Sequence, residues 1–444
     1  MTLDRSELRA MFLLALPLVL SELGWMAMGI EDTMFVGRVS AEAIGAISIG
    51  TTIFYTIAIL GGGLLLGLDT LVSQATGAGD IEDRRRSLIN GLWLVAALVP
   101  TVMLLVQGVT SILGLFGVNP EVLGQVAPYM RALNWSTPPL LVFFCLRRYL
   151  QSMGRPRPVM IAMVAANVVN IAGNWIFVFG HLGAPRLGAV GSAWSTVIAR
   201  TLMAAMVVVA VLRSEPALRA VSRGMDFARV RELLKLGVPA ALQIGAEMFV
   251  WAAATVLAGR LAATSLAGHQ IAVTIVSTTF MLPLGVSSAA AVRVGHAIGR
   301  GDPRGAAHSG WVAVGLGAAI MSISALTLMS VPQFIARLFT PDAVIIAAAV
   351  PLLRLAALFQ LFDGVQVVTT GALRGAGNTS APMICHIIGY GVIGLPLGAW
   401  LCFGDGLGAP GLWIGLTTGL IVIGVALALF WRGAARRIAA SLQG

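Results

Sequence analysis

The sequence has 444 residues, of which 58% are hydrophobic and 11% charged, with a formal net charge of +10. Soluble domains carry about 25% charged residues, so this composition argues against a soluble globular protein. The mean hydropathy of +0.90 indicates a chain that lies almost wholly within a membrane.

Apolar runs of about 18 residues or more recur along the whole chain, and each is long enough to cross a bilayer as a helix. They predict an all-α membrane protein with twelve transmembrane helices and leave almost nothing for a soluble domain. The predicted helices cover residues 10–37, 46–73, 87–112, 126–150, 157–180, 187–212, 232–259, 266–292, 307–331, 347–373, 381–404 and 409–431.

The basic residues gather in every second connection of this topology. Cytoplasmic loops carry an excess of Lys and Arg, so the asymmetry predicts that both termini lie in the cytoplasm. The positive charge is then a topology signal, and we expect no nucleic-acid partner. The residues of these connections include Arg84, Arg85, Arg86, Arg147, Arg148, Arg155, Arg157, Arg213, Arg219, Arg223, Arg229, Arg231, Lys235, Arg293, Arg300, Arg304, Arg374, Arg432, Arg436 and Arg437.

The second half of the chain repeats the first. Shifted by 222 residues, the sequence matches itself without a gap from Pro17 to Asp80, where GAGD falls on GRGD. Each repeat holds six predicted helices, and six is even, so both repeats begin on the same side of the membrane. We therefore expect two six-helix bundles related by a pseudo-two-fold axis along the membrane normal. The predicted parts are an N-lobe of residues 1–213, a cytoplasmic linker of residues 214–231 and a C-lobe of residues 232–444.

The acidic residues inside the predicted helices do not follow the repeat. We therefore expect the functional residues at positions where the two halves of the sequence differ. Glu31 and Asp32 correspond to Ala253 and Ala254, Glu247 corresponds to Trp25, and Asp363 corresponds to Leu140.

Two of these acids lie deep in helices of the second half. An ionised Asp at the centre of a membrane helix costs about 2.5–3.5 kcal/mol, so such acids usually face a cavity or a partner. Glu247 has Gln243 one turn before it, and Asp363 has Gln366 one turn after it, on the same helix face. These polar stripes predict a cation site; the alternative for each acid is a buried hydrogen bond that only holds helices together.

Glu31 and Asp32 are adjacent in the first predicted helix. Neighbouring helical residues point about 100° apart, so the two carboxylates cannot face the same place. Asn170 and Asn174 share one face of the fifth predicted helix and are candidate partners for one of them. The alternative is that both acids lie at the outer membrane interface.

No catalytic motif competes with transport. The chain has no HExxH, GxSxG or Walker A sequence and no CxxC pair, so we expect neither an enzyme nor a cofactor. Because the chain has no nucleotide-binding domain, ATP cannot drive a transport cycle from within it. An ion gradient is the remaining source of energy.

Five stretches carry a family resemblance: IEDTMFVG at 30–37, GLDTLVSQATGAGD at 67–80, GHQIAV at 268–273, RVGHAIGRGD at 293–302, and LRGAGNTSAPMICHIIGYGVIGLPLG at 373–398. Together they resemble the MATE family of multidrug and toxic compound extrusion transporters, and among its branches the NorM-like one. The resemblance covers nearly the whole chain, in order, and includes the two-lobe repeat.

The resemblance implies an antiporter of the bacterial inner membrane that exports cationic, amphiphilic small molecules as protons or sodium ions enter. Glu247 and Asp363 would form the C-lobe coupling site, where sodium is a candidate ligand, with Gln243 and Gln366 beside them. Asp32, Asn170 and Asn174 match an N-lobe polar cluster, and we place Glu31 toward the central cleft. Protons are favoured over sodium because nothing in the sequence demands a sodium cage. We expect a monomer in contact with membrane lipids.

The alternative is a flippase of lipid-linked or saccharide substrates from the same superfamily. Such a protein would carry cationic side chains deep in its cavity to meet phosphates. The deep residues identified from the sequence are acids, which favours a transporter of cations.

Overall fold

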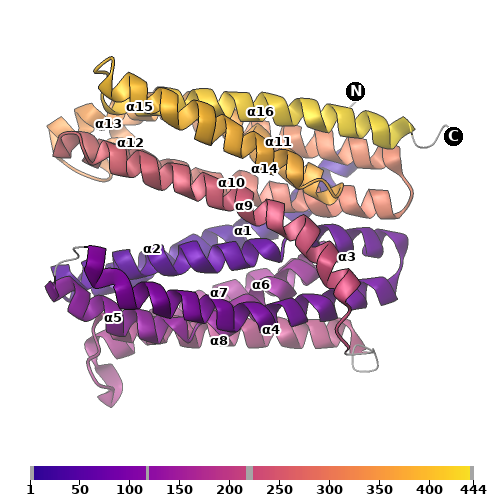
Figure 1. The fold of residues 1–444 in the computed structure, drawn as a ribbon, viewed down its shortest axis with the longest axis horizontal. Coiled ribbons are helices and arrows are strands. Elements are labelled where there is room, and N and C mark those ends of the chain that lie inside the picture. Colours follow the sequence, from indigo (N-terminus) through magenta and orange to yellow (C-terminus); the bar gives the residue numbers. More distant parts are fainter. Residues whose placement is uncertain (1–4, 117–119, 217–223, 441–444) are drawn as a thin grey trace. The chain divides into compact units, whose positions relative to one another are not determined.

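A computed structural model describes residues 5–116, 120–216 and 224–440, and this part of the chain is almost entirely helical (Figure 1). Eleven of its helical segments are long and apolar enough to cross a membrane, which confirms the predicted all-α membrane class. Residues 217–223 of the predicted linker lie outside the described ranges. The helices are α1 (Arg5–Val36), α2 (Ala41–Leu64), α3 (Gly67–Ala78), α4 (Ile81–Ile112), α5 (Pro120–Asn134), α6 (Thr137–Ser152), α7 (Arg157–Phe179), α8 (Ala189–Ser214), α9 (Phe227–Ala258), α10 (Ala263–Gly299), α11 (Pro303–Ser330), α12 (Pro332–Arg337), α13 (Ala343–Gly375), α14 (Ser380–His386), α15 (Leu395–Phe403) and α16 (Ala409–Ala440).

The predicted single helix 126–150 is wrong, because two shorter helices, α5 and α6, occupy this region. The break falls at Trp135 and Ser136, just before Pro138 and Pro139. A proline has no N–H to donate, and its ring clashes with the carbonyl four residues earlier. The two prolines are tolerated in the first turn of α6 but could not continue α5.

The helical path between α14 and α15 also differs from a plain α-helix. Residues Ile387–Gly394 form a π-helix within the eleventh predicted span. Leu395 donates its backbone N–H to the carbonyl of Tyr390, five residues earlier. π-turns are rare and are found frequently at functional sites.

The chain divides into two compact units, each of which draws on both halves of the sequence. The N-unit comprises Leu20–Val72 and Asp80–Ala241, and the C-unit comprises Met1–Val19, Ser73–Gly79 and Leu242–Gly444. The unit boundaries in α1 and α9 lie just after Pro17 and Pro239, which are equivalent positions of the repeat. Each of these two helices therefore begins in one unit and ends in the other.

Glycines allow close helix contacts that follow the repeat. A Cβ built on Gly63 would lie 2.8 Å from the Cα of Ala241, within the N-unit. A Cβ built on Gly285 would lie 2.6 Å from the backbone nitrogen of Val19, within the C-unit. Gly63 and Gly285 are 222 residues apart, and so are Val19 and Ala241. The same contact is thus made once in each unit.

A further contact lies where the two repeats meet inside the C-unit. Ser73 of α3 and Gly295 of α10 are equivalent positions, and a Cβ built on Gly295 would lie 2.7 Å from the Cβ of Ser73. Equivalent residues contact one another only close to a two-fold axis, so α3 and α10 cross with local pseudo-two-fold symmetry. The flanking contacts are reciprocal and join Gly77 to His296 and Gly299 to Gln74.

These close approaches give a stability prediction. Gly63→Ala and Gly285→Ala should each lower the melting temperature of the purified protein, because the new methyl group meets backbone that cannot move aside, and overpacking costs about 1–3 kcal/mol. Gly108→Ala and Gly315→Ala are matched controls, since a Cβ there meets nothing within 4 Å. The controls should be neutral or stabilising, since alanine favours the helix by about 1 kcal/mol. Equal effects at all four positions would contradict the packing argument.

Candidate functional site

Asp32 is at the centre of a buried polar cluster in the N-unit. Its side chain is 4% exposed. Asn174 of α7 donates from Nδ2 to Asp32 Oδ1 at 2.7 Å, and Thr196 of α8 donates from its hydroxyl to Asp32 Oδ2 at 2.9 Å. Asn174 also donates to Asn170 Oδ1 at 3.0 Å. The structure thus brings together Asp32, Asn170 and Asn174, as the sequence predicted, and adds Thr196.

Small residues let α7 and α8 approach closely beside this cluster. A Cβ built on Gly173 would lie 3.0 Å from the side chain of Ser195. Gly173 directly precedes Asn174, and Ser195 directly precedes Thr196, so the close approach sets the two hydrogen-bonding side chains beside Asp32. Thr196 was missed in the sequence because a lone threonine on an apolar helix carries no charge; its spacing of one turn from Ser192 was the available signal.

The N-unit cluster contains buried oxygen atoms that form no hydrogen bond with any described residue. Asn174 Oδ1 and Ser192 Oγ are buried and have no hydrogen-bond partner. Together with the Asp32 carboxylate they form a set of oxygens, and oxygens are the ligands that hard cations prefer. The cluster can therefore neutralise Asp32 with either a proton or a small cation.

Glu31 has a different environment from its neighbour. Its side chain is half-buried, and its Oε2 atom is buried without a hydrogen-bond partner. None of the hydrogen bonds that hold Asp32 reaches it. The two adjacent carboxylates therefore face different surroundings, as the helix geometry predicted.

The C-unit brings Glu247 of α9 close to Asp363 of α13. Trp251, one turn after Glu247, contacts Phe359, one turn before Asp363, with ring centroids 5.7 Å apart and edge to face. Trp413 of α16 packs against both rings, which fixes the two helix faces. The two carboxylates lie within range of mutual charge repulsion.

The C-unit carboxylates are poorly supplied with hydrogen bonds. Asp363 is 2% exposed and accepts one bond, from Gln366 Nε2 to Oδ1 at 3.1 Å. Asp363 Oδ2 and Gln366 Oε1 are buried without a partner. Glu247 is half-buried, and among the described residues no side chain donates to it. These atoms can accept a proton or ligate a cation without displacing any internal bond.

Tyr390 completes the C-unit site and was not predicted. It is fully buried on the π-helix, its hydroxyl has no hydrogen-bond partner, and it lies within electrostatic range of both Glu247 and Asp363. A π-turn changes the direction of the side chains it carries, and the sequence shows no periodicity that reveals it. The glycines at 389, 391 and 394 were the available signal.

Gln243 lies against His386 rather than against either carboxylate. His386 Nδ1 is 2.8 Å from the carbonyl of Pro382, an acceptor, so Nδ1 carries the proton. The other ring nitrogen, Nε2, is then free to accept, and it faces Gln243 Nε2 at 3.5 Å. Gln243 is one turn before Glu247 on α9, so His386 lies at the edge of the C-unit site.

Other intramembrane acids have arginine partners. Glu22 pairs with Arg147, and both side chains are buried. Asp69 pairs with Arg148 at 3.3 Å. Both pairs lie within the N-unit and neutralise acids that the sequence alone leaves unexplained. In contrast, Asp32, Glu31, Glu247 and Asp363 form no ion pair with any described residue, and this difference separates structural acids from candidate site acids.

Among the described residues, no group of three or more His, Cys, Asp and Glu side chains could hold a metal ion.

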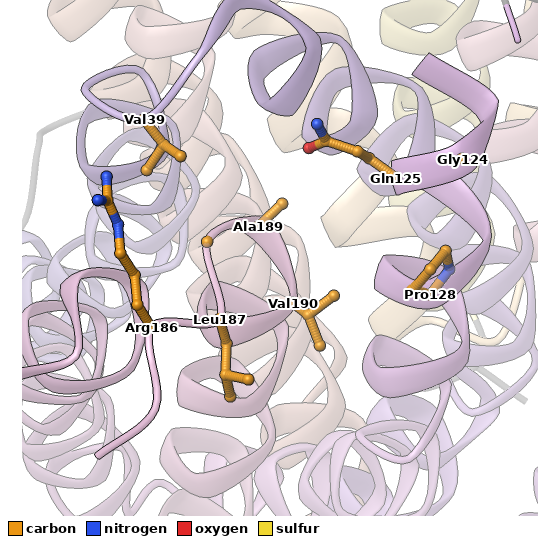
Figure 2. Close-up of a pocket in the computed structure, with 9 residues that line it drawn as sticks. Val39, Gly124, Gln125, Pro128, Arg186, Leu187, Ala189 and Val190 are labelled. Carbon is orange, nitrogen blue, oxygen red and sulfur yellow. The ribbon is translucent and has the colours of Figure 1, made fainter. Parts of the chain in front are cut away.

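A pocket of about 390 Å³ is lined by residues of the N-unit, several of which are drawn in Figure 2. Its two polar side chains are Gln125 and Arg186, and the rest of its lining is apolar or glycine. None of the candidate site acids lines it.

One known protein family matches both repeats of the chain. The family model described as MatE matches residues 17–176 and again residues 239–400, so the two matches begin 222 residues apart. The chain belongs to the MATE family. Its members are transporters, and this MATE chain is accordingly a membrane transporter and not an enzyme.

Relatives of this MATE chain cover nearly its whole length. The probable multidrug resistance protein NorM of Mesorhizobium japonicum is 36% identical over 438 residues, which are 96% of this chain and 94% of that protein. The multidrug resistance protein MdtK of Edwardsiella ictaluri is 32% identical over 433 residues, with coverages of 95% and 94%. The eukaryotic MATE transporter AtDTX14 has the same fold, with a TM-score of 0.89 and 21% identity over 98% of both chains.

The pairing of acids predicts which substitutions unfold the MATE chain. Glu22→Gln should lower its melting temperature strongly, because a buried Arg147 without its partner costs about 3–5 kcal/mol. The double variant Glu22→Gln with Arg147→Met should recover most of that loss. Glu247→Gln is the control and should leave the melting temperature near that of the wild type. A destabilisation by Glu247→Gln as large as that by Glu22→Gln would show that Glu247 is a structural acid.

Proposed function

We propose that this MATE transporter exports cationic, amphiphilic small molecules across a bacterial inner membrane in exchange for protons or sodium ions. The observation that carries the proposal is the set of intramembrane carboxylates without an arginine partner, Asp32 in the N-unit and Glu247 with Asp363 in the C-unit. The names of the NorM and MdtK relatives, both multidrug resistance proteins, support efflux of drugs. We propose that the transporter works as a monomer with both termini in the cytoplasm.

Antiport follows from the limited negative charge of each site. A buried carboxylate is stabilised by a proton, a sodium ion or an organic cation, but one negative charge cannot be fully neutralised by two cations at once. Binding of an incoming ion therefore lowers the affinity of the site for the substrate, and binding of the substrate lowers its affinity for the ion. Because each ligand binds one conformation better than the other, this competition shifts the transporter between its states.

Protons are the proposed coupling ion at the C-unit site. One proton shared between Glu247 and Asp363 removes the repulsion between two carboxylates in an apolar environment. The buried Tyr390 hydroxyl has no partner among the described residues and is a hydrogen-bond donor within electrostatic range of both carboxylates. The aromatic rings of Trp251 and Phe359 beside the acids suit the apolar part of an amphiphilic cation.

A flippase of lipid-linked saccharides is the second candidate, and one observation favours it. The sequence analysis identified only acids as deep residues. The structure adds Arg200, a fully buried arginine of the N-unit. A cationic side chain is what a lipid phosphate would meet. The two carboxylate sites nevertheless outnumber this one arginine, and the excess of acidic sites favours the transport of cations.

The coupling ion is tested in vesicles that contain the purified full-length protein. A fluorescent cationic dye should be expelled under an inward-directed pH gradient with sodium absent. Dye efflux that requires a sodium gradient and ignores pH would refute the proton assignment. If neither gradient moves the dye, and a fluorescent lipid-linked saccharide crosses the bilayer instead, the second candidate is correct.

Site variants in the same vesicles test the residue roles. Asp363→Asn and Glu247→Gln should each abolish dye efflux while the melting temperature stays near that of the wild type, because each removes the charge for which ion and dye compete. Asp32→Asn should also impair efflux, and Glu31→Gln should impair it less. An equal loss for Glu31→Gln and Asp32→Asn would mean that the adjacent acids have exchanged roles.

A further inference from the structure

Arg200 of α8 is a fully buried cation without an acidic partner. Its side chain is 0% exposed, and within the described residues it forms no ion pair. It donates from Nη1 to Ser136 Oγ at 2.6 Å and from Nη2 to the Tyr55 hydroxyl at 2.7 Å, while Nε has no partner. The other fully or largely buried arginines of the N-unit, Arg147 and Arg229, each contact a carboxylate.

Aromatic rings enclose the Arg200 guanidinium. Its central carbon lies 5.6 Å from the ring centroid of Trp25, 5.2 Å from that of Phe54 and 5.4 Å from that of Tyr55. Cation–π contacts and two hydrogen bonds to neutral hydroxyls stabilise the charge in part. They do not neutralise it, and a net charge in the membrane interior is unfavourable unless an opposite charge lies near.

Among the described residues of the N-unit, Asp32 is a buried carboxylate without an ion pair, and it is hydrogen-bonded to α8, the helix that carries Arg200. Thr196, which donates to Asp32, is one turn before Arg200 on α8, a rise of about 6 Å. The buried Tyr129 of α5 lies within electrostatic range of both Asp32 and Arg200. The titratable groups that the structure relates directly to Asp32 are Glu31 on α1 and Tyr129 on α5. Tyr55 on α2 and Arg200 on α8 lie within electrostatic range of Tyr129, and α7 contributes neutral asparagines.

We propose that Arg200 is the built-in counter-charge of Asp32 and sets how tightly the N-unit holds a cation. When Asp32 is ionised, the two residues together are neutral. When a proton, sodium ion or organic cation binds Asp32, the unit is left with the net positive charge of Arg200, which opposes a second cation and helps the first to leave. Arg200 is thus a positioning residue that acts through Asp32, and its role in a transport cycle rests on the proposed antiport.

The size of the effect follows from Coulomb's law. The Arg200 guanidinium lies beside Trp25, which precedes Asp32 on α1 by a helix rise of about 10 Å. Two opposite unit charges at about that separation, in an environment of effective dielectric constant about 20, change a binding constant by about tenfold. Removal of the Arg200 charge should therefore strengthen cation binding at Asp32 by about tenfold. For a proton, that is a rise of about one unit in the pH at which Asp32 is half protonated.

The test measures protonation directly in the full-length protein. A hydrophobic carbodiimide reacts with protonated carboxyl groups in membranes, and tandem mass spectrometry distinguishes Asp32 from the adjacent Glu31. In Arg200→Gln, which keeps hydrogen-bonding capacity and removes the charge, the pH of half-maximal labelling at Asp32 should rise by about one unit. Arg200→Lys, which keeps the charge, should leave it unchanged, and labelling of Asp363 in the C-unit is the internal control.

Two outcomes would overturn the proposal: an unchanged labelling pH at Asp32 in folded Arg200→Gln, or an equal shift at Asp32 and Asp363. A third is that the variant loses lipid-linked saccharide transport with Asp32 labelling unaltered, because Arg200 would then bind an anionic headgroup. Labelling needs no transport, so a failed dye assay with a shifted labelling pH would refute the antiporter and leave the charge pair intact.

A stability cycle keeps the proposal testable if Arg200→Gln folds poorly. Asp32→Asn and Arg200→Gln should each lower the melting temperature, because each leaves one buried charge uncompensated. The double variant should lose less than the sum of the two single losses, since no unpaired charge is left. Strictly additive losses would show that the two charges do not interact.

Discussion

The cost of an unneutralised charge in a low-dielectric interior is the constraint on which this structure depends. The N-unit satisfies it with ion pairs at two of its intramembrane acids, Glu22 with Arg147 and Asp69 with Arg148. At Asp32 the groups in direct contact are amide and hydroxyl donors, and no described cation is bonded to the carboxylate. In the described part of the C-unit, Asp363 accepts one side-chain hydrogen bond and Glu247 accepts none. The carboxylates that a passing cation can neutralise are thus those that form no direct ion pair with a described residue.

The internal repeat separates architecture from chemistry. Equivalent glycines, Gly63 and Gly285, allow equivalent backbone contacts in the two units, and the crossing at Ser73 and Gly295 joins equivalent positions directly. Both units need these contacts, so they follow the repeat. The carboxylates do not: Asp32 falls on an alanine and Asp363 on a leucine of the other half. A symmetric scaffold therefore carries two unlike sites, one supplied with polar donors and one with aromatic rings and unsatisfied oxygens.

Much of the candidate site could be predicted from the sequence because acids in apolar helices are conspicuous. The acids are visible in the composition of the helices, and the asparagine pair at 170 and 174 and Gln366 follow from one-turn spacing. Gln243 was expected beside Glu247 and instead lies against His386. Thr196, Tyr390 and Arg200 could not be found in this way. Thr196 and Tyr390 are uncharged, and Tyr390 is directed by a π-turn that no hydrophobic period reveals. The sequence shows that Arg200 carries a charge. Only the tertiary structure shows that no described acidic side chain is bonded to it, and this is what makes the residue important.

The sequence by itself determined the all-α membrane class, the repeat and the set of intramembrane acids, because membrane thickness fixes helix length and the aqueous loops concentrate charge. It also contained the break before Pro138, which local backbone chemistry imposes. Only the tertiary structure decided which acids are neutralised and which are left open. Arg147 and Glu22 are 125 positions apart in the chain, and Thr196 and Asp32 are 164 apart. Charges interact through distance in space, and that distance is set by the packing of helices that are remote in sequence.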